Sequence, residues 1–488
     1  MDNQPNSHNI IKGVSSQTVV TLSLGILDII SFSIMSRLLS KQDFGYYAAI
    51  IALSTIFSSL SSNGIGAAIV QRKELDRSYV YSAFTLSLVI GGIASGLLCA
   101  FSGLLSKSVA DSSMQFPLIL FSSTLIMSCI ISVNMAILQR QLKFLRMGLI
   151  NLISLVLTTV VAIILAIKGF GYYAILAKAI LGSIITLLLS YYAADIKYRL
   201  YFNINKFKEI FSFSGWLMAS SLFRNFANQI DRLLMSSLFS VATLGTYSRP
   251  KEFISNISDK FNSIFDTTLF PMLSTIQDDK IKMRTSYLYA LNFLNILGML
   301  LSITFFFNSE LIIRIFFGED WLYIGPLFKV LSLSSVLYIN GRIGDIFLRS
   351  LALTKSQFYF RVMQLIITVI LIILLYGYGI TAVAIAAMLG YGIVVLLKVI
   401  YISHHIKIPL RQSLYAIFKG WYFVIYIIPI YLLSLYIYPS GLLGNLLVLL
   451  SFFLCLVMIF VVFPSSVGDN YKLIFYPKIK NFILKFVK

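Results

Sequence analysis

Apolar runs of about 20 residues recur along the whole chain, and each is long enough for a helix to cross the roughly 30 Å of hydrocarbon in a membrane. Hydrophobic residues make up 58% of the 488-residue sequence, and the mean hydropathy is +0.87. A soluble core of one or two domains does not bury so much apolar surface. Backbone polar groups in lipid must be satisfied internally, and the alternation of a β-barrel is absent. The sequence therefore predicts an all-α polytopic membrane protein.

Polar breaks between the runs predict about 14 transmembrane helices. Their expected ranges are 14–38, 44–69, 79–103, 114–138, 147–168, 171–193, 212–238, 243–273, 285–308, 326–351, 358–377, 380–403, 413–438 and 441–463. With the N-terminus in the cytoplasm, the cytoplasmic flanks hold several times as many basic residues as the opposite flanks, which hold Arg37, Lys41, Lys107, Lys168 and Arg314. The positive-inside rule thus predicts that both termini are cytoplasmic. Topology explains most of the net charge of +20, so no nucleic-acid partner is expected.

Two sets of residues recur at nearly the same offset. The first set recurs 200 positions later and comprises Ile30, Met35, Ser36, Leu38, Ser40, Gly45 and Tyr47. The second recurs 208 positions later and comprises Gly169, Gly171, Ala174 and Gly182. These repeats predict two parallel six-helix lobes, residues 1–200 and 201–405. Two additional helices at 406–466 and a basic cytoplasmic tail at 467–488 then follow, the tail lying either in the lipid interface or in solvent.

Ionisable residues gather on single faces of three helices in the second lobe. A charge at membrane depth costs about 2.5 kcal/mol or more unless it meets a partner or water, so these faces predict a polar cavity between the lobes. The expected substrate-binding residues are Arg224, Asn228, Arg232, Arg249, Asn256, Lys260, Arg342 and Arg349. Candidates for coupling to an ion are Asp28, Asp231, Glu252, Asp259 and Asp345.

Dry packing of these charges is the alternative. Asp345 has the spacing of an intrahelical salt bridge to both Arg342 and Arg349, which would neutralise the charges without a cavity. The first lobe is plainer: it contributes Asp28 and is expected to offer no cation at membrane depth. The surplus of cations on the polar faces favours an anionic or zwitterionic cargo, because a guanidinium can bond two phosphate oxygens at once.

The three cysteines and three histidines lack the spacing of metal ligands or of a catalytic constellation. Neither a metal nor a cofactor is therefore expected.

Three stretches of sequence resemble a known transporter family. Residues 37–47 read RLLSKQDFGYY, residues 64–72 read GIGAAIVQR, and residues 231–250 read DRLLMSSLFSVATLGTYSRP. They resemble the polysaccharide flippase family, the Wzx-type O-antigen and exopolysaccharide transporters of the multidrug, oligosaccharidyl-lipid and polysaccharide exporter superfamily.

The resemblance implies a flippase and not an enzyme, located in the bacterial cytoplasmic (inner) membrane. Its implied substrate is undecaprenyl-pyrophosphate-linked oligosaccharide, which would move from the cytoplasmic to the outer leaflet by alternating access during surface polysaccharide synthesis, including lipopolysaccharide. Coupling to a proton or sodium gradient, as an antiporter, and a link to polysaccharide polymerase or export machinery are further implications.

Other functions remain open at this point. A multidrug or cation exporter of the same superfamily would present unpaired acids and little basic surplus, and a flippase for lipid-linked peptidoglycan precursors would differ only in its cargo. A polysaccharide polymerase or ligase usually needs a large external loop, whereas the longest one expected here, residues 308–325, is short. A purely structural scaffold would have no use for charged faces in lipid.

Overall fold

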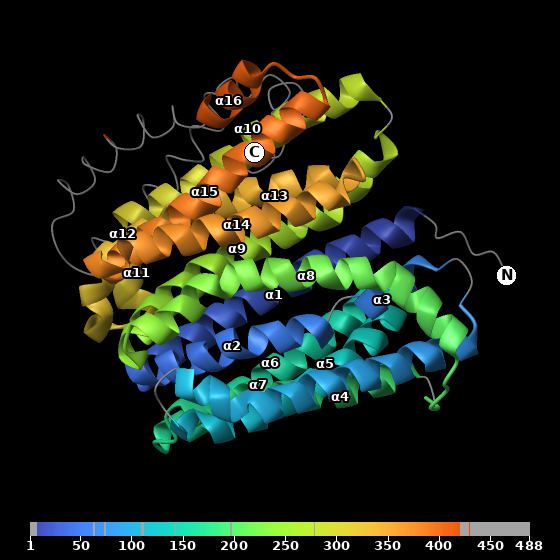
Figure 1. Ribbon diagram of the computed structural model, residues 1–488, viewed down its shortest axis with the longest axis horizontal. Helices are drawn as coiled ribbons and strands as arrows, with labels where there is room; N and C mark the ends of the chain where they lie inside the picture. The colour runs from blue at the N-terminus through green and yellow to red at the C-terminus, as the bar shows by residue number, and fades with distance from the viewer. Residues whose placement is uncertain are drawn as a thin grey trace, which may run out of the picture. The chain divides into compact units, whose positions relative to one another are not determined.

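The computed structural model describes residues 7–61, 64–72, 75–108, 112–141, 143–195, 198–277, 279–419 and 429, and every regular element among them is helical (Figure 1). Within that part of the chain, 8 helical segments are long and apolar enough to cross a membrane. The all-α polytopic class is thus confirmed, while the count of 14 is not. Residues 420–428 and 430–488 lie outside the described part, and with them most of the two predicted C-terminal helices and the whole tail.

The chain forms two compact units, Met1–Arg249 and Pro250–Lys488. The first unit contains α1 (Ser7–Leu38), α2 (Lys41–Ser61), α3 (Gly64–Gln71), α4 (Arg77–Ser108), η1 (Ser112–Met114), α5 (Gln115–Arg140), α6 (Phe144–Ile167), α7 (Tyr172–Ala194) and α8 (Ile204–Leu238). Helix α9 (Val241–Thr275) runs through the division. The second unit continues with α10 (Lys280–Phe307), α11 (Ser309–Phe316), η2 (Glu319–Ile324), α12 (Gly325–Ser332), α13 (Ser334–Ser350), α14 (Thr354–Leu375), η3 (Tyr376–Tyr378), α15 (Ile380–His405) and α16 (Leu410–Lys419).

Each unit is a bundle with its own apolar core. In the first, α5 packs against α4 and α7, α6 packs against α1 and α7, and α8 packs against α2, α3 and α4. In the second, α13 packs against α10 and α15, and α14 lies along α15 (Figure 1). The lobe boundary was expected near residue 200. The boundary between the compact units lies later, between Arg249 and Pro250, because α8 packs within the first unit. The division into lobes by the sequence repeat stays a prediction.

The structure differs from the expected helix boundaries at several places. The expected helix 44–69 is two helices, α2 and α3. The expected helix 326–351 is interrupted at Leu333, whose N–H donates to the Val330 carbonyl in a tighter turn. Helix α8 begins eight residues early, at Ile204 rather than 212, because the Asn203 side chain accepts hydrogen bonds from the N–H groups of Asn205 and Lys206 and so caps the helix. The expected loop 308–325 contains α11 and η2.

Repeat-related residues build the same local structure twice. The Ser40 hydroxyl accepts from the N–H of Asp43 at 3.2 Å, and the Ser240 hydroxyl accepts from the N–H of Thr243 at 3.3 Å, so the two serines cap α2 and α9 alike. The N-caps of α7 and α15 are Gly171 and Gly379, with φ of 55° and 93°. These left-handed values favour glycine at both positions.

The repeat-related pair Gly45 and Gly245 marks a very close helix crossing in the first unit. A Cβ atom on Gly45 would lie 1.9 Å from the Val241 carbonyl oxygen, and one on Gly245 would lie 1.8 Å from the Lys41 carbonyl oxygen. Lys41 and Val241 are themselves 200 positions apart. The start of α2 and the start of α9 therefore cross in a reciprocal contact, which only residues without a side chain permit.

Candidate functional site

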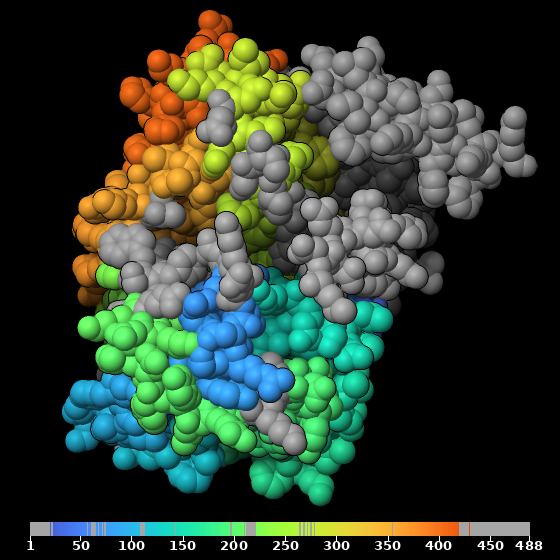
Figure 2. Space-filling view, turned by 90° about the vertical axis from the view of Figure 1, so that its right-hand side faces the viewer, coloured from blue at the N-terminus to red at the C-terminus, as the bar shows by residue number. Residues whose placement is uncertain are grey.

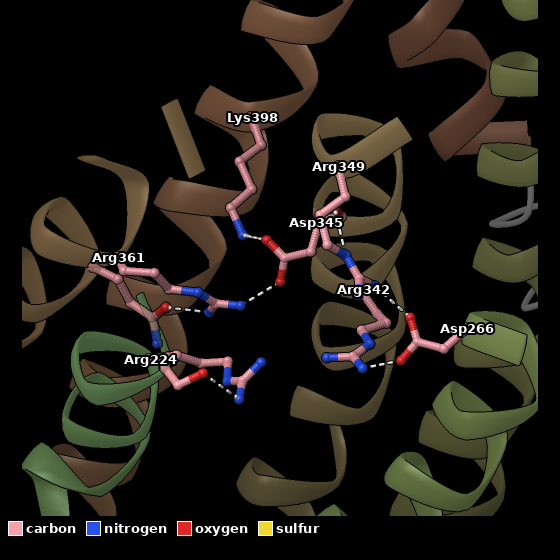
Figure 3. Close-up of polar contacts among 9 residues, drawn as sticks. Arg224, Asp266, Arg342, Asp345, Arg349, Arg361 and Lys398 are labelled. Atoms are coloured by element: carbon pink, nitrogen blue, oxygen red, sulfur yellow. Dashed lines mark hydrogen bonds and ion pairs between the residues drawn. The ribbon is translucent and has the colours of Figure 1, made fainter. Parts of the chain in front are cut away.

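A fully buried charge cluster joins three helices of the second unit. Asp345 of α13, Arg361 of α14 and Lys398 of α15 are only 2%, 4% and 2% exposed. The Lys398 ammonium lies 2.7 Å from Oδ1 of Asp345, and the Arg361 guanidinium pairs with the other carboxylate oxygen (Figure 3). Arg361 also donates to the Gln364 side chain at 3.0 Å. Gly344 leaves room for the Lys398 stem, because a Cβ atom there would already lie 3.2 Å from Lys398 Cδ.

A second, partly exposed group lies between α13 and α9. Arg349 Nη2 lies 2.7 Å from Oδ1 of Asp266, and Arg342 pairs with Oδ2 of the same carboxylate (Figure 3). The side chains of Arg342, Arg349 and Asp266 are 30%, 35% and 18% exposed. The Arg349 guanidinium also lies over the Phe270 ring, 5.2 Å from its centroid. Two residues seven apart share a face of a helix, which is why both arginines reach one carboxylate.

The salt bridges of Asp345 run between helices and not within α13, but they do neutralise buried charge among packed helices, as the dry-packing alternative supposed for this residue. The Asp345 carboxylate bonds to α14 and α15 instead of to its helical neighbours. Only a backbone contact remains within α13, from Arg349 Nε to the Asp345 carbonyl at 3.4 Å. The arginines instead turn to α9, because a partner on another helix brings both carboxylate oxygens within reach.

Three members of these groups were absent from the sequence-based site, namely Asp266, Arg361 and Lys398. Arg361 and Lys398 lie near the ends of their predicted helices, where the positive-inside rule counts them as flanking charges. Asp266 does carry a signal, because it follows the predicted Asp259 by seven residues and so extends the same face of α9. Helix spacing alone does not say which of these charges meet.

In the first unit, predicted residues of α8 bond to α9. The Asp231 carboxylate is buried and accepts a hydrogen bond from the Tyr247 hydroxyl. Arg232 donates to the Gln229 side chain at 3.0 Å and to the Ser248 carbonyl at 3.5 Å. Further towards the start of α8, Arg224 Nη2 lies 3.4 Å from the hydroxyl of Ser221 on the same helix.

Arg249 is buried against α1 and α2, at 6% exposure. Its Nη2 donates to the Phe32 carbonyl at 2.8 Å, and its Nε donates to the Ser36 hydroxyl at 3.1 Å. The guanidinium carbon lies 3.4 Å from the Phe32 ring centroid and 4.1 Å from that of Phe44. Contacts with an aromatic face favour a cation held away from bulk water. Arg249 thus anchors α9 to α1, and its assignment to substrate stays a prediction.

The first unit does contain a cation inside a membrane-length helix, contrary to expectation. Lys178 of α7 donates from Nζ to the Ser31 hydroxyl of α1 at 2.5 Å, and Thr159 of α6 bonds to the same hydroxyl at 3.2 Å. A search for several charged residues on one side of a helix does not find Lys178, because it is a single charge in an otherwise apolar segment.

The remaining predicted residues lie on α1, α8 and α9. Asn228, Asn256 and Asp259 are exposed, whereas Asp28, Glu252 and Lys260 are intermediate. Their roles in binding substrate or an ion stay predictions. Among the residues that the structure describes, no group of three or more His, Cys, Asp or Glu side chains is placed to hold a metal ion.

Comparison with known sequences places this architecture among polysaccharide proteins. The family described as "Polysaccharide biosynthesis protein" matches residues 34–326. The Lipopolysaccharide biosynthesis protein WzxC of Escherichia coli K12 is 24% identical over 365 residues, 72% of each chain. The Succinoglycan biosynthesis transport protein ExoT of Rhizobium meliloti is 22% identical over 308 residues, 63% of this chain and 62% of that one.

Solved structures share the fold at low identity. The lipid II flippase MurJ in an inward closed conformation aligns with a TM-score of 0.70 at 18% identity, over 95% of this chain and 99% of that one. An inward-facing MATE multidrug transporter aligns with a TM-score of 0.62 at 14% identity, over 81% and 99%. The family match spans more than half of the sequence, so the resemblance drawn from the motifs is confirmed, and this chain belongs to the polysaccharide biosynthesis protein family, as a multi-pass membrane protein with a transporter fold.

Proposed function

We propose that the protein is a flippase that moves undecaprenyl-pyrophosphate-linked oligosaccharide from the cytoplasmic to the outer leaflet of a bacterial inner membrane by alternating access. The names of its relatives support a role in surface polysaccharide synthesis, and the MurJ fold supports a lipid-linked cargo. A polymerase or export machinery on the outer face would then consume the flipped unit.

The observation that carries the proposal is the pairing of Arg342 and Arg349 with the two oxygens of one carboxylate, that of Asp266. Two guanidinium groups that converge on adjacent oxygens of a single anion also suit a phosphate or pyrophosphate. Asp266 then serves as an internal counter-ion, which neutralises the arginines until the substrate takes its place. The partial exposure of all three side chains is consistent with such an exchange.

Charge balance in the second unit supports an anionic ligand. In the described ion pairs, Arg342, Arg349, Arg361 and Lys398 meet two carboxylates, those of Asp266 and Asp345. Asp259 also interacts electrostatically with Arg342, which leaves four cations to three carboxylates. Unbalanced charge among membrane helices is costly, and an arriving anion would offset that cost. A multidrug or cation exporter would instead need surplus acids here.

Deletion of the gene tests the proposed cargo. The lipid-linked oligosaccharide that the protein carries should accumulate in the inner leaflet, and the wild-type gene should restore surface polymer. Accumulation of a lipid-linked peptidoglycan precursor would favour the related flippase function. Normal polymer and no accumulated intermediate would reject the proposal.

Substitutions in the arginine pair test the proposed site. Arg342→Gln/Arg349→Gln should abolish complementation and weaken binding of undecaprenyl pyrophosphate to the purified protein, because charge-assisted bonds of about 1.5–3 kcal/mol each are lost. Asp266→Asn should strengthen that binding by about tenfold, because the carboxylate no longer competes with the substrate for the arginines. A tenfold change in affinity corresponds to about 1.4 kcal/mol, which is no more than one charge-assisted bond contributes. Export by this variant should fall, because the substrate leaves more slowly.

Arg314→Gln is a matched control for the arginine pair. Arg314 of α11 also pairs with two carboxylates, Glu310 and Glu319, but on the exposed surface. The Arg314→Gln variant should keep both export and substrate binding.

Weaker undecaprenyl pyrophosphate binding in Asp266→Asn would show that Asp266 does not compete with the substrate.

A further inference from the structure

A groove with a basic end lies between α10 and α16 in the second unit. It is an open groove with a volume of about 1330 Å³, more than the roughly 300–1,000 Å³ of most small-molecule sites. Figure 2 shows the face on which orange-red α16 lies beside the yellow-green start of α10. Side chains of α10 line one wall, and the residues from Lys407 to Phe418 line the other.

Two side-chain bonds to the backbone fix the walls of this groove. Arg284 Nε of α10 donates to the Ile406 carbonyl at 2.6 Å, where α15 ends. Eleven residues further along α10, the Asn295 amide donates to the Ile417 carbonyl of α16. The groove is therefore held at both ends by the fold itself and is not a chance gap between loose segments.

Charge and apolar surface are separated along the groove. Arg284, Lys407 and Arg411 lie at the end where α10 begins and α15 finishes, and none of the described residues that line the groove is acidic. Apolar and aromatic side chains line the remainder, namely Leu288, Tyr289, Leu414, Tyr415 and Phe418. On α10, Arg284, Leu288 and Asn292 are four residues apart and form one stripe about 12 Å long.

The backbone at Lys407 is unusual. Lys407 has a φ of 56°, a left-handed conformation that is costly for a residue other than glycine. The N–H of Lys407 bonds to the His404 carbonyl at 3.1 Å, and that of Ile408 bonds to the Ser403 carbonyl at 2.8 Å, which closes α15 and turns the chain into α16. A lysine thus stands at a turn position where glycine or asparagine would be less strained, and it lines the groove.

We propose that this groove binds an anionic membrane phospholipid, with the phosphate headgroup at Arg284, Lys407 and Arg411 and an acyl chain along the apolar stripe. Basic pockets between membrane helices on the cytoplasmic side suit anionic headgroups, and the predicted topology places these three residues on that side. Tyr289 and Tyr415 also line the groove and are exposed, and tyrosine is enriched at the interface of a bilayer. The site is separate from the Asp266 group and does not depend on the transport proposal.

The test compares lipid binding by two charge-matched variants of the full-length protein in an uncharged detergent. Lys407→Asn/Arg411→Gln removes two cations from the groove, and asparagine tolerates the left-handed turn. Lys280→Gln/Lys282→Gln removes two cations near the same end of α10 that do not line it. The probes are phosphatidylglycerol and phosphatidylcholine, and the readouts are bound lipid by native mass spectrometry and the lipid-induced shift in melting temperature.

The groove variant should bind phosphatidylglycerol about tenfold more weakly, because each lost cation weakens attraction to an anionic lipid several-fold. The control variant should retain the wild-type preference for phosphatidylglycerol over phosphatidylcholine. Equal loss in both variants would show general surface attraction and overturn the proposal. Displacement of phosphatidylglycerol by undecaprenyl phosphate in the wild type, with loss of undecaprenyl phosphate binding in the groove variant, would assign the groove to the transport substrate instead.

Discussion

At the scale of single residues, buried charge is the dominant feature of the second unit. Asp345 satisfies two cations from two other helices, and all three side chains are almost completely buried. Breaking a buried ion pair by removing one partner typically costs about 3–5 kcal/mol, since the remaining charge stays buried without compensation. Asp345 therefore holds α13, α14 and α15 together, in addition to any role in coupling to an ion.

Asp345→Asn is expected to lower the melting temperature of the purified protein markedly, because Arg361 and Lys398 lose their carboxylate. Asp320→Asn, a change of the same chemistry on exposed η2, should leave it unchanged. The triple replacement Asp345→Leu/Arg361→Met/Lys398→Met should recover much of the stability, since no buried charge remains. Equal melting temperatures for Asp345→Asn and wild type would contradict a stabilising role.

The sequence identified the charged face of α13 but not its partners. Spacing along a helix shows that Arg342, Asp345 and Arg349 share a side, and this was sufficient to expect a polar site. The partners come from helices far apart in the chain, so the pairings depend on packing that no local pattern records. Arg361 and Lys398 were hidden for a specific reason, since charges near helix ends also serve topology.

At the scale of helices, the reciprocal crossing of α2 and α9 shows how the repeat is used. The recurrence of Gly45 as Gly245 was visible in the sequence, and it predicted related lobes. The repeat does not predict that each glycine contacts the other's helix. A repeat in the sequence identifies structurally equivalent positions, but it does not say which of them are in contact. The caps at Ser40 and Ser240 follow the same pattern.

Gly45→Ala and Gly245→Ala are expected to destabilise the protein by similar amounts, about 1–3 kcal/mol each, because each methyl group forces the same crossing apart. The double variant should lose less than the sum, since the first substitution has already opened the contact. Gly96→Ala on α4 is the control, because a Cβ atom there meets nothing within 4 Å. Additive losses, measured by thermal unfolding, would show that the two glycines act independently.

A surface ion pair ties the start of α8 to the segment before α4. Lys206 and Ser78 both donate to Asp76, and these bonds, with the Lys206 bond the larger influence, lower the pKa of the Asp76 carboxyl to about 2 from an ordinary 3.8. Figure 2 shows the blue α3 to α4 segment beside the green start of α8. A carboxyl whose pKa is lowered on folding stabilises the folded state above its ordinary pKa.

The difference in melting temperature between wild type and Asp76→Asn should therefore be constant at neutral pH. It should shrink as the pH falls below about 4 and vanish only below the folded-state pKa of about 2, where the wild-type carboxyl is also protonated. A difference that stays at its neutral-pH size down to pH 2 would mean that the carboxylate charge is not its source.

At the scale of the whole molecule, composition and the length of the apolar runs were sufficient for the fold class. Most of the expected helices up to residue 405 have a counterpart, because a span of lipid-compatible residues has few structural alternatives. The charge-rich helices α8 and α9 are not among the 8 segments apolar enough to qualify as spans by composition. Both were nevertheless expected from the apolar runs between polar breaks, at 212–238 and 243–273.

The proposed cargo carries negative charge outward across a membrane that is negative inside. Each charge gains about 2.3 kcal/mol per 100 mV, so dissipating the potential should slow flipping of the pyrophosphate-linked substrate in proteoliposomes. Collapsing a proton or sodium gradient separately would identify a coupling ion. An unchanged rate under both treatments would show that neither the potential nor an ion gradient drives transport.

Helix α9 continues unbroken from Val241 to Thr275 across the division between the two units. It carries Arg249, fastened to α1, and Asp266, fastened to the arginines of α13, about 25 Å apart along one rod. The two contacts belong to different compact units, so each fastens only its own part of α9. Loss of the Asp266 pairs should therefore loosen α9 from α13, while the Arg249 bonds to α1 remain available to the first half of the helix.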